Sequence, residues 1–357
     1  MSIENTDYRY EKLDLENPFD VKLVKDFLAK QDFDYNPKEV DCTMIIYNLN
    51  NKIIGTGSYK TRTLRYIAVA PEYRESTAFA DIVTYLTNLL LETHSHTFVF
   101  TRPDKAKLFE GLGYSEIARA EPLFAVLEFG FRTIKNYQNY LQDIKIKTFT
   151  NQIAAIVVNC NPFTNGHKYL IEKASAENEL VYLFVVEENL SVFPFEIRWK
   201  LIKNGIIHLP NVIMVKAGHY IVSGGIFPSY FLKNEAIDLI SEKQAELDVT
   251  IFADYFVPIL NIKKRYIGTE NYCVTTAAYN KAMHKILPQK GVEVIEITRK
   301  SAGDESNFIS ASKVREAIKN DNLLIIKDFL PQSTFEFLTS EDAKEIIEKI
   351  KKGSGRH

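Results

Sequence analysis

Residues 153–174, IAAIVVNCNPFTNGHKYLIEKA, decide the fold of the second half of this chain. Ile153–Val158 is an unbroken apolar and largely β-branched run, typical of a strand that is buried on both faces of a parallel sheet. Pro162 lies in the polar stretch that follows, where it marks the end of the strand because proline cannot donate a ladder hydrogen bond. A helical spacing of apolar residues begins after Gly166. The stretch therefore predicts a strand, a turn and a helix, in that order.

The predicted turn has the composition of an anion-binding site. The first N–H groups of a helix lack partners inside the helix, and the helix dipole is positive at that end. Thr164 adds a hydroxyl and His167 a ring nitrogen near this point, and Gly166 leaves the backbone open because it has no Cβ. These residues are candidate ligand contacts. The alternative is an ordinary strand-to-helix turn whose histidine packs at the start of the helix.

Strand and helix patterns alternate from residue 150 onward. The predicted strands after the first cover residues 181–186, 212–215, 249–253, 265–267 and 292–297, and the predicted helices cover residues 195–206, 229–240, 274–287, 312–319, 323–329 and 340–351. This alternation predicts an α/β domain with a Rossmann-like, doubly wound parallel sheet. Ligands bind such sheets at the carboxyl ends of the strands, where the strand order reverses. The Thr164–His167 turn follows the first strand at that edge.

A second candidate segment, NFISASKVRE at residues 307–316, follows the last predicted strand and opens a helix. Ser310 or Ser312 can cap this helix, which leaves other N–H groups for a phosphate. Arg315 lies one turn into the helix and carries a planar fork that suits two phosphate oxygens. The alternative is a capped helix with an exposed arginine.

Both segments carry a family resemblance. Thr164-Asn-Gly-His167 resembles the T/HxGH signature of the nucleotidyltransferase superfamily, whose members transfer AMP or CMP and release pyrophosphate. Ile309–Arg315 resembles the second signature of that superfamily, ISxTxxR, with Ser312 at the threonine position. Because the two signatures occur in the expected order on two strand-to-helix turns, we expect a nucleotidyltransferase domain over residues 150–357.

The first 131 residues predict a different class of domain. A helix near residues 21–28, a three-strand meander over 43–70, a helix over 77–92, a strand over 96–101 and a strand pair over 114–129 make an α+β pattern. Ile67–Arg74 and Leu108–Tyr114 resemble two corners of the GNAT acetyltransferase fold. Glu75–Ala78 replaces the glycines that in this family receive the phosphates of acetyl-CoA, and side chains and negative charge oppose an anion there. We therefore expect a GNAT-like domain over 1–131 without acetyltransferase activity, and a connecting helix over 132–149.

Four stretches narrow the resemblance further. Asn159–His167, Phe227–Leu232, Tyr266–Glu270 and Ile309–Arg315 together are similar to the citrate (pro-3S)-lyase ligases, as is the order of the two domains. The resemblance implies ATP-dependent activation of acetate as acetyl-adenylate, with release of pyrophosphate. The acetyl group would then pass to the thiol of the citrate lyase acyl-carrier subunit, with release of AMP. On this hypothesis the GNAT-like domain cradles the pantetheine part of the carrier arm.

The resemblance also implies site residues. The catalytic contacts to the phosphates would be His167, Thr164 and Arg315. The nucleotide-binding residues would be Asn161, Phe163, Gly166, Lys168, Gly268, Thr269, Glu270, Ile309, Ser310 and Ser312. Residues 268–270 would contact adenosine, although a plain loop is an equal alternative. Arg198 either adds charge to the site or, as we favour, lies solvated on its helix.

The chemistry does not demand a catalytic triad. Acetate is already an anion at neutral pH, because carboxyl pKa values lie at roughly 4–5, and the acceptor thiol brings its own nucleophile. The protein must position the groups and supply positive charge around the transferred phosphorus. Mg²⁺ would bridge the triphosphate mainly through water and phosphate oxygens, so no protein metal ligands are predicted. The expected cofactors are ATP and Mg²⁺.

Composition limits the other possibilities. The 357 residues carry a formal net charge of -2, which argues against a nucleic-acid binder. No apolar run reaches the roughly 18 residues that a membrane helix needs, and the acidic, polar start is unlike a signal peptide. Three scattered cysteines, Cys42, Cys160 and Cys273, make neither a disulfide framework nor a zinc site. We therefore expect a cytoplasmic protein without membrane or nucleic-acid partners.

Other functions stay open at this stage. A small-molecule adenylyltransferase acting on a pantetheine or nicotinamide phosphate would share both signatures, but it would not need the first domain and would form a dinucleotide-like product. A GNAT acetyltransferase with a regulatory nucleotide domain would turn over acetyl-CoA without ATP. A non-catalytic nucleotide-binding protein would not need the reactive residues, and a tRNA synthetase would need a basic anticodon-binding module that this sequence lacks.

Overall fold

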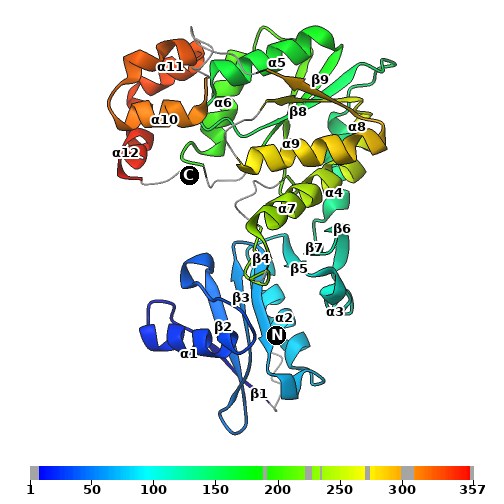
Figure 1. The fold of residues 1–357 in the computed structure, drawn as a ribbon, viewed down its shortest axis with the longest axis vertical. Coiled ribbons are helices and arrows are strands. Elements are labelled where there is room, and N and C mark those ends of the chain that lie inside the picture. The colour runs from blue at the N-terminus through cyan, green and yellow to red at the C-terminus, as the bar shows by residue number, and fades with distance from the viewer. Residues whose placement is uncertain are drawn as a thin grey trace. The chain divides into compact units, whose positions relative to one another are not determined.

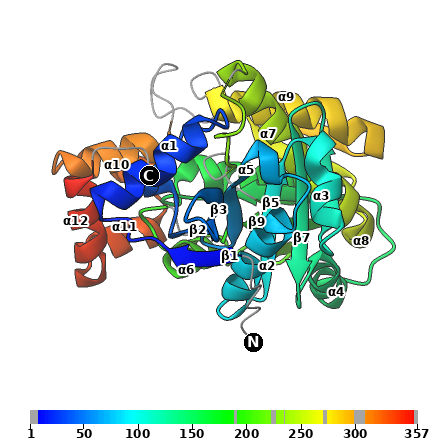
Figure 2. The same ribbon diagram turned by 90° about the horizontal axis from the view of Figure 1, so that it is seen from below.

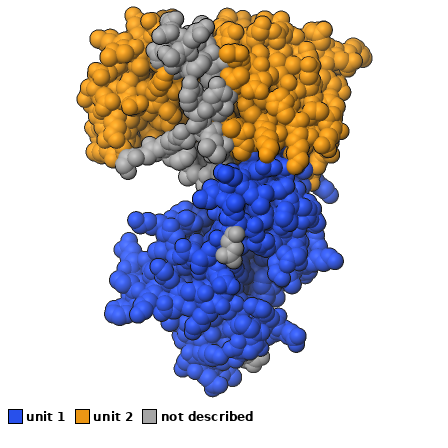
Figure 3. Space-filling view, in the orientation of Figure 1, with its two compact units in different colours: residues 1–139, 224–250 blue, residues 140–223, 251–357 orange. Residues whose placement is uncertain are grey.

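The computed structural model describes residues 8–187, 191–221, 227–233, 235–269, 274–298 and 309–353. The chain divides into two compact units, which Figure 3 draws in blue and orange. Unit 1 contains residues 1–139 and 224–250, and unit 2 contains residues 140–223 and 251–357. A segment from the second half of the sequence therefore packs with the first half, whereas the sequence-based proposal divides the chain consecutively after residues 131 and 149.

Unit 1 is built on one seven-stranded sheet with the order β1-β2-β3-β4-β5-β7-β6 (Figure 1). Its strands are β1 (Tyr8–Lys12), β2 (Cys42–Asn48), β3 (Ile53–Lys60), β4 (Thr63–Val69), β5 (His96–Thr101), β6 (Ser115–Ala120) and β7 (Phe124–Gly130). Its helices are α1 (Pro18–Ala29), α2 (Ala78–Leu91), α3 (Ala106–Glu110) and most of α7 (Ile237–Ile251), and α4 (Ile134–Ile144) runs across the boundary between the two units. The α+β class expected for the first part of the chain is confirmed.

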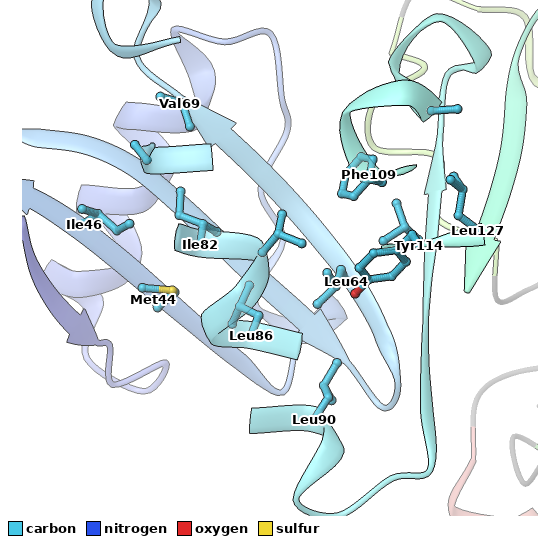
Figure 4. Close-up of a cluster of buried hydrophobic side chains, with 14 of the residues drawn as sticks. Met44, Ile46, Leu64, Val69, Ile82, Leu86, Leu90, Phe109, Tyr114 and Leu127 are labelled. Atoms are coloured by element: carbon cyan, nitrogen blue, oxygen red, sulfur yellow. The ribbon is translucent and has the colours of Figure 1, made fainter. Parts of the chain in front are cut away.

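The alternation of β2 explains why this sheet is covered on both faces. Met44 and Ile46 join the cluster that contains Ile82 and Leu86 of α2, and Figure 4 shows these side chains facing one another. Ile45 and Tyr47, one position further along, pack instead with Val24, Phe27 and Leu28 of α1. Successive side chains of a strand point to opposite faces, so an apolar run without polar gaps produces two cores.

β4 and β5 form the one parallel pair of this sheet, and they are paired over a short distance. Thr63 pairs with Phe98 and Leu64 with Val99, and no later rung joins the two strands. The register between β3 and β4 shifts after Thr56, and Tyr66 lies at this irregularity with a left-handed backbone (φ 52°). A bulge of this kind bends a strand away from its neighbour.

Residues 227–233 and 235, which we call the returning segment, belong to unit 1. Aromatic side chains of this segment contact β4 and β5 beyond the last residues that pair these two strands. We call Phe227, Tyr230 and Phe231 the aromatic wedge. The ring of Tyr230 lies 4.1 Å from that of Tyr66 on β4, and the ring of Phe227 lies 5.1 Å from that of Phe100 on β5. The returning segment is fixed further by an ion pair of 2.9 Å between Arg102 and Glu235. The aromatic wedge therefore contacts β4 and β5 in the part of unit 1 where these two strands are no longer paired with each other.

Unit 2 contains a five-stranded sheet with the order β10-β9-β8-β11-β12, in which every pair is parallel. Its strands are β8 (Ile153–Val158), β9 (Leu180–Val185), β10 (Val212–Lys216), β11 (Lys264–Gly268) and β12 (Glu293–Ile297). Its helices are α5 (Asn165–Glu177), α6 (Phe195–Gly205), α8 (Val257–Leu260), α9 (Val274–Ile286), α10 (Ala311–Lys319), α11 (Gln332–Leu338) and α12 (Lys344–Lys352). This is a doubly wound α/β sheet, so the predicted fold class is confirmed.

The order of the strands sets the position of the ligand edge. The chain builds outward from β8 through β9 to β10, then returns to place β11 on the other side of β8. The strand order therefore reverses between β8 and β11. Pairing between these two strands stops at Ala155 and Arg265, so the carboxyl half of β8 has no ladder partner in β11.

Two sequence predictions after residue 150 differ from the structure: the helix predicted at residues 229–240 begins only at Ile237, as α7, and the strand predicted at residues 249–253 is helical. Residues 249–253, predicted as a strand, complete α7 and begin a π-helical turn, η4 (Phe252–Phe256). The rings of Phe252 and Phe256 pack on Phe184 of β9. A short apolar run rich in β-branched residues is compatible with a buried helix as well as with a strand, and here the contact with the sheet selects the helix.

The C-terminal helices form a separate layer of unit 2. α10, α11 and α12 lie together in both views (Figure 1, Figure 2). Their shared core contains Val314, Ile318, Leu338, Ile346 and Ile350, together with residues of the short helix η6 (Leu323–Phe329). α11 also packs against α6. This layer fixes the start of α10, which carries the second sequence motif.

Candidate active site

The turn between β8 and α5 is held by a reciprocal pair of hydrogen bonds. Thr164 caps α5, and its hydroxyl accepts a hydrogen bond from the main-chain N–H of His167 (3.4 Å). In return, the main-chain N–H of Thr164 donates to Nδ1 of His167 (3.1 Å). This is a capping box with histidine in the place usually taken by glutamate or glutamine. The arrangement fixes the imidazole at the first turn of the helix.

The same contact defines the tautomer of His167. A nitrogen that accepts a hydrogen bond from a main-chain N–H carries no proton, so the neutral ring holds its proton on Nε2. The Thr164 hydroxyl also lies 2.9 Å from Nδ1. Nε2–H is then the hydrogen-bond donor of the ring.

The two sequence motifs meet in unit 2. The guanidinium of Arg315 donates from Nη1 to the main-chain carbonyl of Asn161, across 154 residues of sequence. A Cβ built on Gly166 would lie 3.2 Å from the carbonyl oxygen of Ile309. The start of α10 therefore lies directly against the turn that begins α5, and the two helix N-termini share one location.

The start of α10 decides between the two serines that the sequence left open. Ser310 is the cap, with an extended backbone and a side chain that accepts from the N–H of Lys313 (3.2 Å). Ser312 has another role, because its hydroxyl accepts a hydrogen bond from Nη2 of Arg315 (3.4 Å). Ser312 and Asn161 thus hold the guanidinium from two sides. Two helix N-termini, one guanidinium and one imidazole therefore lie close together, an arrangement whose formal and partial positive charges favour an anion.

Comparison with known proteins identifies the family of this chain. Residues 153–338 match the family model described as the citrate lyase ligase C-terminal domain. A citrate (pro-3S)-lyase ligase of Haemophilus influenzae is 32% identical over 324 residues, which cover 89% of this chain and 95% of that protein. The chain belongs to the citrate lyase ligase family.

Two solved structures each resemble a part of this chain. A bifunctional NMN adenylyltransferase/ADP-ribose pyrophosphatase of Francisella tularensis has a TM-score of 0.34 at 14% identity, covering 56% of this chain and 52% of the other. A GNAT-family N-acetyltransferase of Escherichia coli has a TM-score of 0.28 at 12% identity, covering 35% of this chain and 82% of the other.

Three of the expected ligand residues have structural partners in this ligase-family fold. Phe163 is fully buried; a Cβ on Gly205 would come within 2.5 Å of its ring, and its carbonyl accepts from the hydroxyl of Thr334 (2.9 Å). Asn161 is buried, and its side chain accepts from the N–H of Phe193 (3.1 Å). Both residues therefore contact the protein interior and help to hold the β8–α5 turn in place. Lys168 is half-buried and pairs with Glu172 at 3.7 Å on the same helix.

Gly268 and Thr269, two of the three residues expected to contact adenosine, lie at the same sheet edge. Gly268 ends β11, the strand next to β8, and a Cβ on it would meet nothing within 4 Å. Thr269 donates its N–H to the carbonyl of Ile297 (2.9 Å), and Asn280 donates to the carbonyl of Gly268 (3.1 Å). Glu270 lies outside the described residues. Gly268 and Thr269 therefore lie at the end of β11, one of the two strands between which the strand order reverses.

Arg198 corrects one sequence-based interpretation. The sequence favours a solvated side chain on α6, yet Arg198 is 0% exposed. Its guanidinium donates to three main-chain carbonyls, those of Asn159, Val186 and Phe193. The signal was present in the sequence of this ligase-family chain, because Arg198 lies three residues after Phe195 and three before Leu201, on the buried face of the helix.

Proposed function

We propose that the chain activates acetate with ATP to form acetyl-adenylate and pyrophosphate, and then transfers the acetyl group to the thiol of the citrate lyase acyl-carrier subunit. The observation that carries this proposal is the meeting of the two motifs, in which Arg315 reaches Asn161 and Ile309 lies against Gly166. Family membership supports the ligase reaction and its carrier partner.

The residues suit a reaction that needs positioning and positive charge. Acetate carries its own negative charge at neutral pH and attacks the α-phosphorus without a general base. The Nε2–H of His167 and the N–H groups at the start of α5 would hold oxygens on the reacting phosphate. Arg315 and the start of α10, at Ser310, would hold the departing pyrophosphate. Donors that are fixed before the reaction stabilise the charge that develops on the leaving group.

The donor set also bears on magnesium. Among the residues that the structure describes, no three His, Cys, Asp or Glu side chains are grouped as metal ligands. Mg²⁺ prefers octahedral oxygen coordination and keeps several waters, so it suits a site where ATP supplies the other oxygens. The ion would enter with ATP, screen the triphosphate charge and leave positioning to Arg315 and the helix N-termini.

The first experiment is acetate-dependent exchange of labelled pyrophosphate into ATP, measured without any carrier protein. Exchange shows that an adenylate forms reversibly from acetate and ATP. No exchange with acetate, either alone or in the presence of the thiol-form carrier, would contradict the proposal. Omitting acetate is the control, because ATP hydrolysis alone does not return label to ATP.

Product analysis separates the alternative small-molecule adenylyltransferase. That enzyme would join AMP to a pantetheine or nicotinamide phosphate, so label from ATP would appear in a dinucleotide-like product. The proposed ligase releases free AMP when the carrier thiol is acetylated. Acetylated carrier and AMP in equal amounts, with no product from either phosphate acceptor, is the expected result.

The described part of the chain contains no helix that is long and apolar enough to cross a membrane. We propose a cytoplasmic location on a separate ground, because the proposed reaction consumes ATP, which the cytoplasm supplies. Fractionation of cells that express the native chain would test this.

A further inference from the structure

Arg198 lies where the two loops at the ligand edge of the sheet come together. The last rung between β8 and β9 joins Val158 to Val185, and the N–H of Val186 then donates to the carbonyl of Val158 (3.0 Å). Nη1 of Arg198 donates to the carbonyl of Asn159 (2.8 Å) and to that of Val186 (2.7 Å). One guanidinium nitrogen therefore joins the ends of the two strands after the ladder stops.

The same side chain reaches the start of its own helix. Nε of Arg198 donates to the carbonyl of Phe193 (3.0 Å), just before α6 begins. The loop after β9 is tied to the loop after β8 by two further contacts. Ser191 exchanges hydrogen bonds with the side chain of Asn159, and the N–H of Phe193 donates to the side chain of Asn161. Arg198 is the centre of a network that ends at the residue to which Arg315 binds.

Stability alone does not account for this arginine. Burying a guanidinium costs free energy, and an apolar residue of similar volume is often as stable or more stable in such a position. The neighbours on the buried face of α6, Phe195, Leu201 and Ile202, are all apolar. A charged residue is expected among them where a fixed loop conformation matters more for function than the stability that an apolar residue would add.

We propose that Arg198 is a positioning residue for the transfer site. By holding the carbonyls of Asn159, Val186 and Phe193, it fixes the backbone that leads into Thr164 and His167. It also sets the Asn161 carbonyl against Arg315. Arg198 acts through these groups and does not touch the substrate. The part of this inference that concerns turnover rests on the proposed function, and the part that concerns the loop does not.

The test compares Arg198→Lys and Arg198→Met with Lys200→Met, which removes an exposed charge from the same helix. We expect pyrophosphate exchange per folded molecule to fall by roughly 10-fold in Arg198→Lys and 100-fold in Arg198→Met, since small misplacements of reacting groups have effects of this size. The fall should appear mainly in kcat, and Lys200→Met should match the wild type. Amide hydrogen exchange of residues 159–167 should become faster in both Arg198 variants.

Two results would overturn the proposal. One is unchanged exchange per folded molecule in Arg198→Met, and the other is a loss that follows the global free energy of unfolding without a local change at residues 159–167. If the wild type shows no pyrophosphate exchange, the proposed function fails and the loop is still tested by amide exchange. Faster amide exchange of residues 159–167 in both Arg198 variants then supports the positioning role, and unchanged amide exchange contradicts it.

Discussion

The guanidinium of Arg315 donates a hydrogen bond to the main-chain carbonyl of Asn161, which joins the two sequence motifs of unit 2. Ser312 accepts a second hydrogen bond from the same guanidinium. The position of Arg315 therefore depends on the turn that carries Thr164 and His167. A substitution in one motif is therefore expected to disturb the other motif, and this can be tested.

Replacing Arg315 by lysine should lower kcat/KM for pyrophosphate exchange by about 100-fold, or roughly 2.7 kcal/mol of transition-state stabilisation. The ammonium keeps the charge but loses the fork that holds Asn161 and Ser312 together with a phosphate. Lys319→Met at the end of the same helix is the control, because Lys319 is exposed. An Arg315→Lys variant with wild-type kcat/KM would show that the fork is not used.

His167→Ala should reduce turnover by two to three decades, about 3–4 kcal/mol, because it removes a positioned donor to the reacting phosphate. The variant also loses the acceptor for the N–H of Thr164. Thr164→Ser is the companion variant, since serine keeps the hydroxyl that caps α5 and approaches Nδ1. Near-normal turnover in His167→Ala, measured by pyrophosphate exchange, would remove the imidazole from the reaction.

Gly166→Ala should reduce the activity without reducing the stability. Alanine favours a helix over glycine by up to about 1 kcal/mol, so the free energy of unfolding should hold or rise slightly. Its Cβ would lie 3.2 Å from the carbonyl oxygen of Ile309, and a main-chain atom cannot turn aside as a flexible side chain can. The two motifs must then separate by a few tenths of an ångström.

We expect pyrophosphate exchange in Gly166→Ala to fall by about 10-fold or more. Gly111→Ala is the matched control, because its Cβ would meet its nearest atoms at 3.6 Å, an ordinary contact. Urea denaturation and exchange kinetics measured on both variants decide the point. Full activity in Gly166→Ala would mean that the contact with Ile309 is not part of the working site.

Tyr230→Ala should destabilise unit 1 by about 2–3 kcal/mol, because it empties the space beside Tyr66 and Phe33. Burial raises the pKa of Tyr230, which also fits a hydroxyl held inside the protein against the backbone of Tyr66. Phe19→Ala is the control, since Phe19 is 83% exposed. Equal urea midpoints for the two variants would show that the aromatic wedge does not support the unit.

The carboxyl group of Glu177 should make the free energy of unfolding depend on pH. Hydrogen bonds from Lys173 first, and then from the hydroxyl of Tyr266, lower the pKa of this carboxyl group below its usual value. A lowered pKa means that the stabilisation is complete above the unfolded-state pKa and is lost as the pH falls through the folded-state value.

Glu177→Gln should therefore reduce the free energy of unfolding by less than about 1 kcal/mol at pH 7, since the carboxylate is partly exposed. The difference from the wild type should shrink as the pH falls below roughly 4. Urea denaturation at a series of pH values measures it. A difference that is the same at pH 7 and pH 3 would assign the effect to packing and not to the charge.

Local patterns predicted much of the architecture. The apolar runs placed β8 and β5 at the bounds that the structure has, because β-branched segments between turn residues have few alternatives. The run at residues 249–253 failed, since its apolar side chains serve a buried helix equally well. α11 (Gln332–Leu338) was not predicted, and its packing on α6 is a contact between distant parts of the chain.

The sequence located the two motifs, but it did not reveal the contacts that hold them together. Signature residues mark where Thr164, His167 and Arg315 belong, but a signature does not say which groups hold them. The tautomer of His167 and the burial of Arg198 depend on contacts with main-chain atoms. The sequence does not show where those main-chain atoms lie. The roles proposed for Thr164, His167, Arg315, Lys168 and residues 268–270 remain predictions.

The grouping of residues 224–250 with unit 1 has a consequence for how the chain can be taken apart. The polypeptide passes between its units after residues 139, 223 and 250, so neither unit is a continuous module that a gene fusion could carry whole. A shortened chain that starts at residue 140 would present Phe227, Tyr230 and Phe231 without the strands that they cover. Co-expressed fragments 1–139 and 140–357 should instead recognise each other through these rings and restore one protein from two chains.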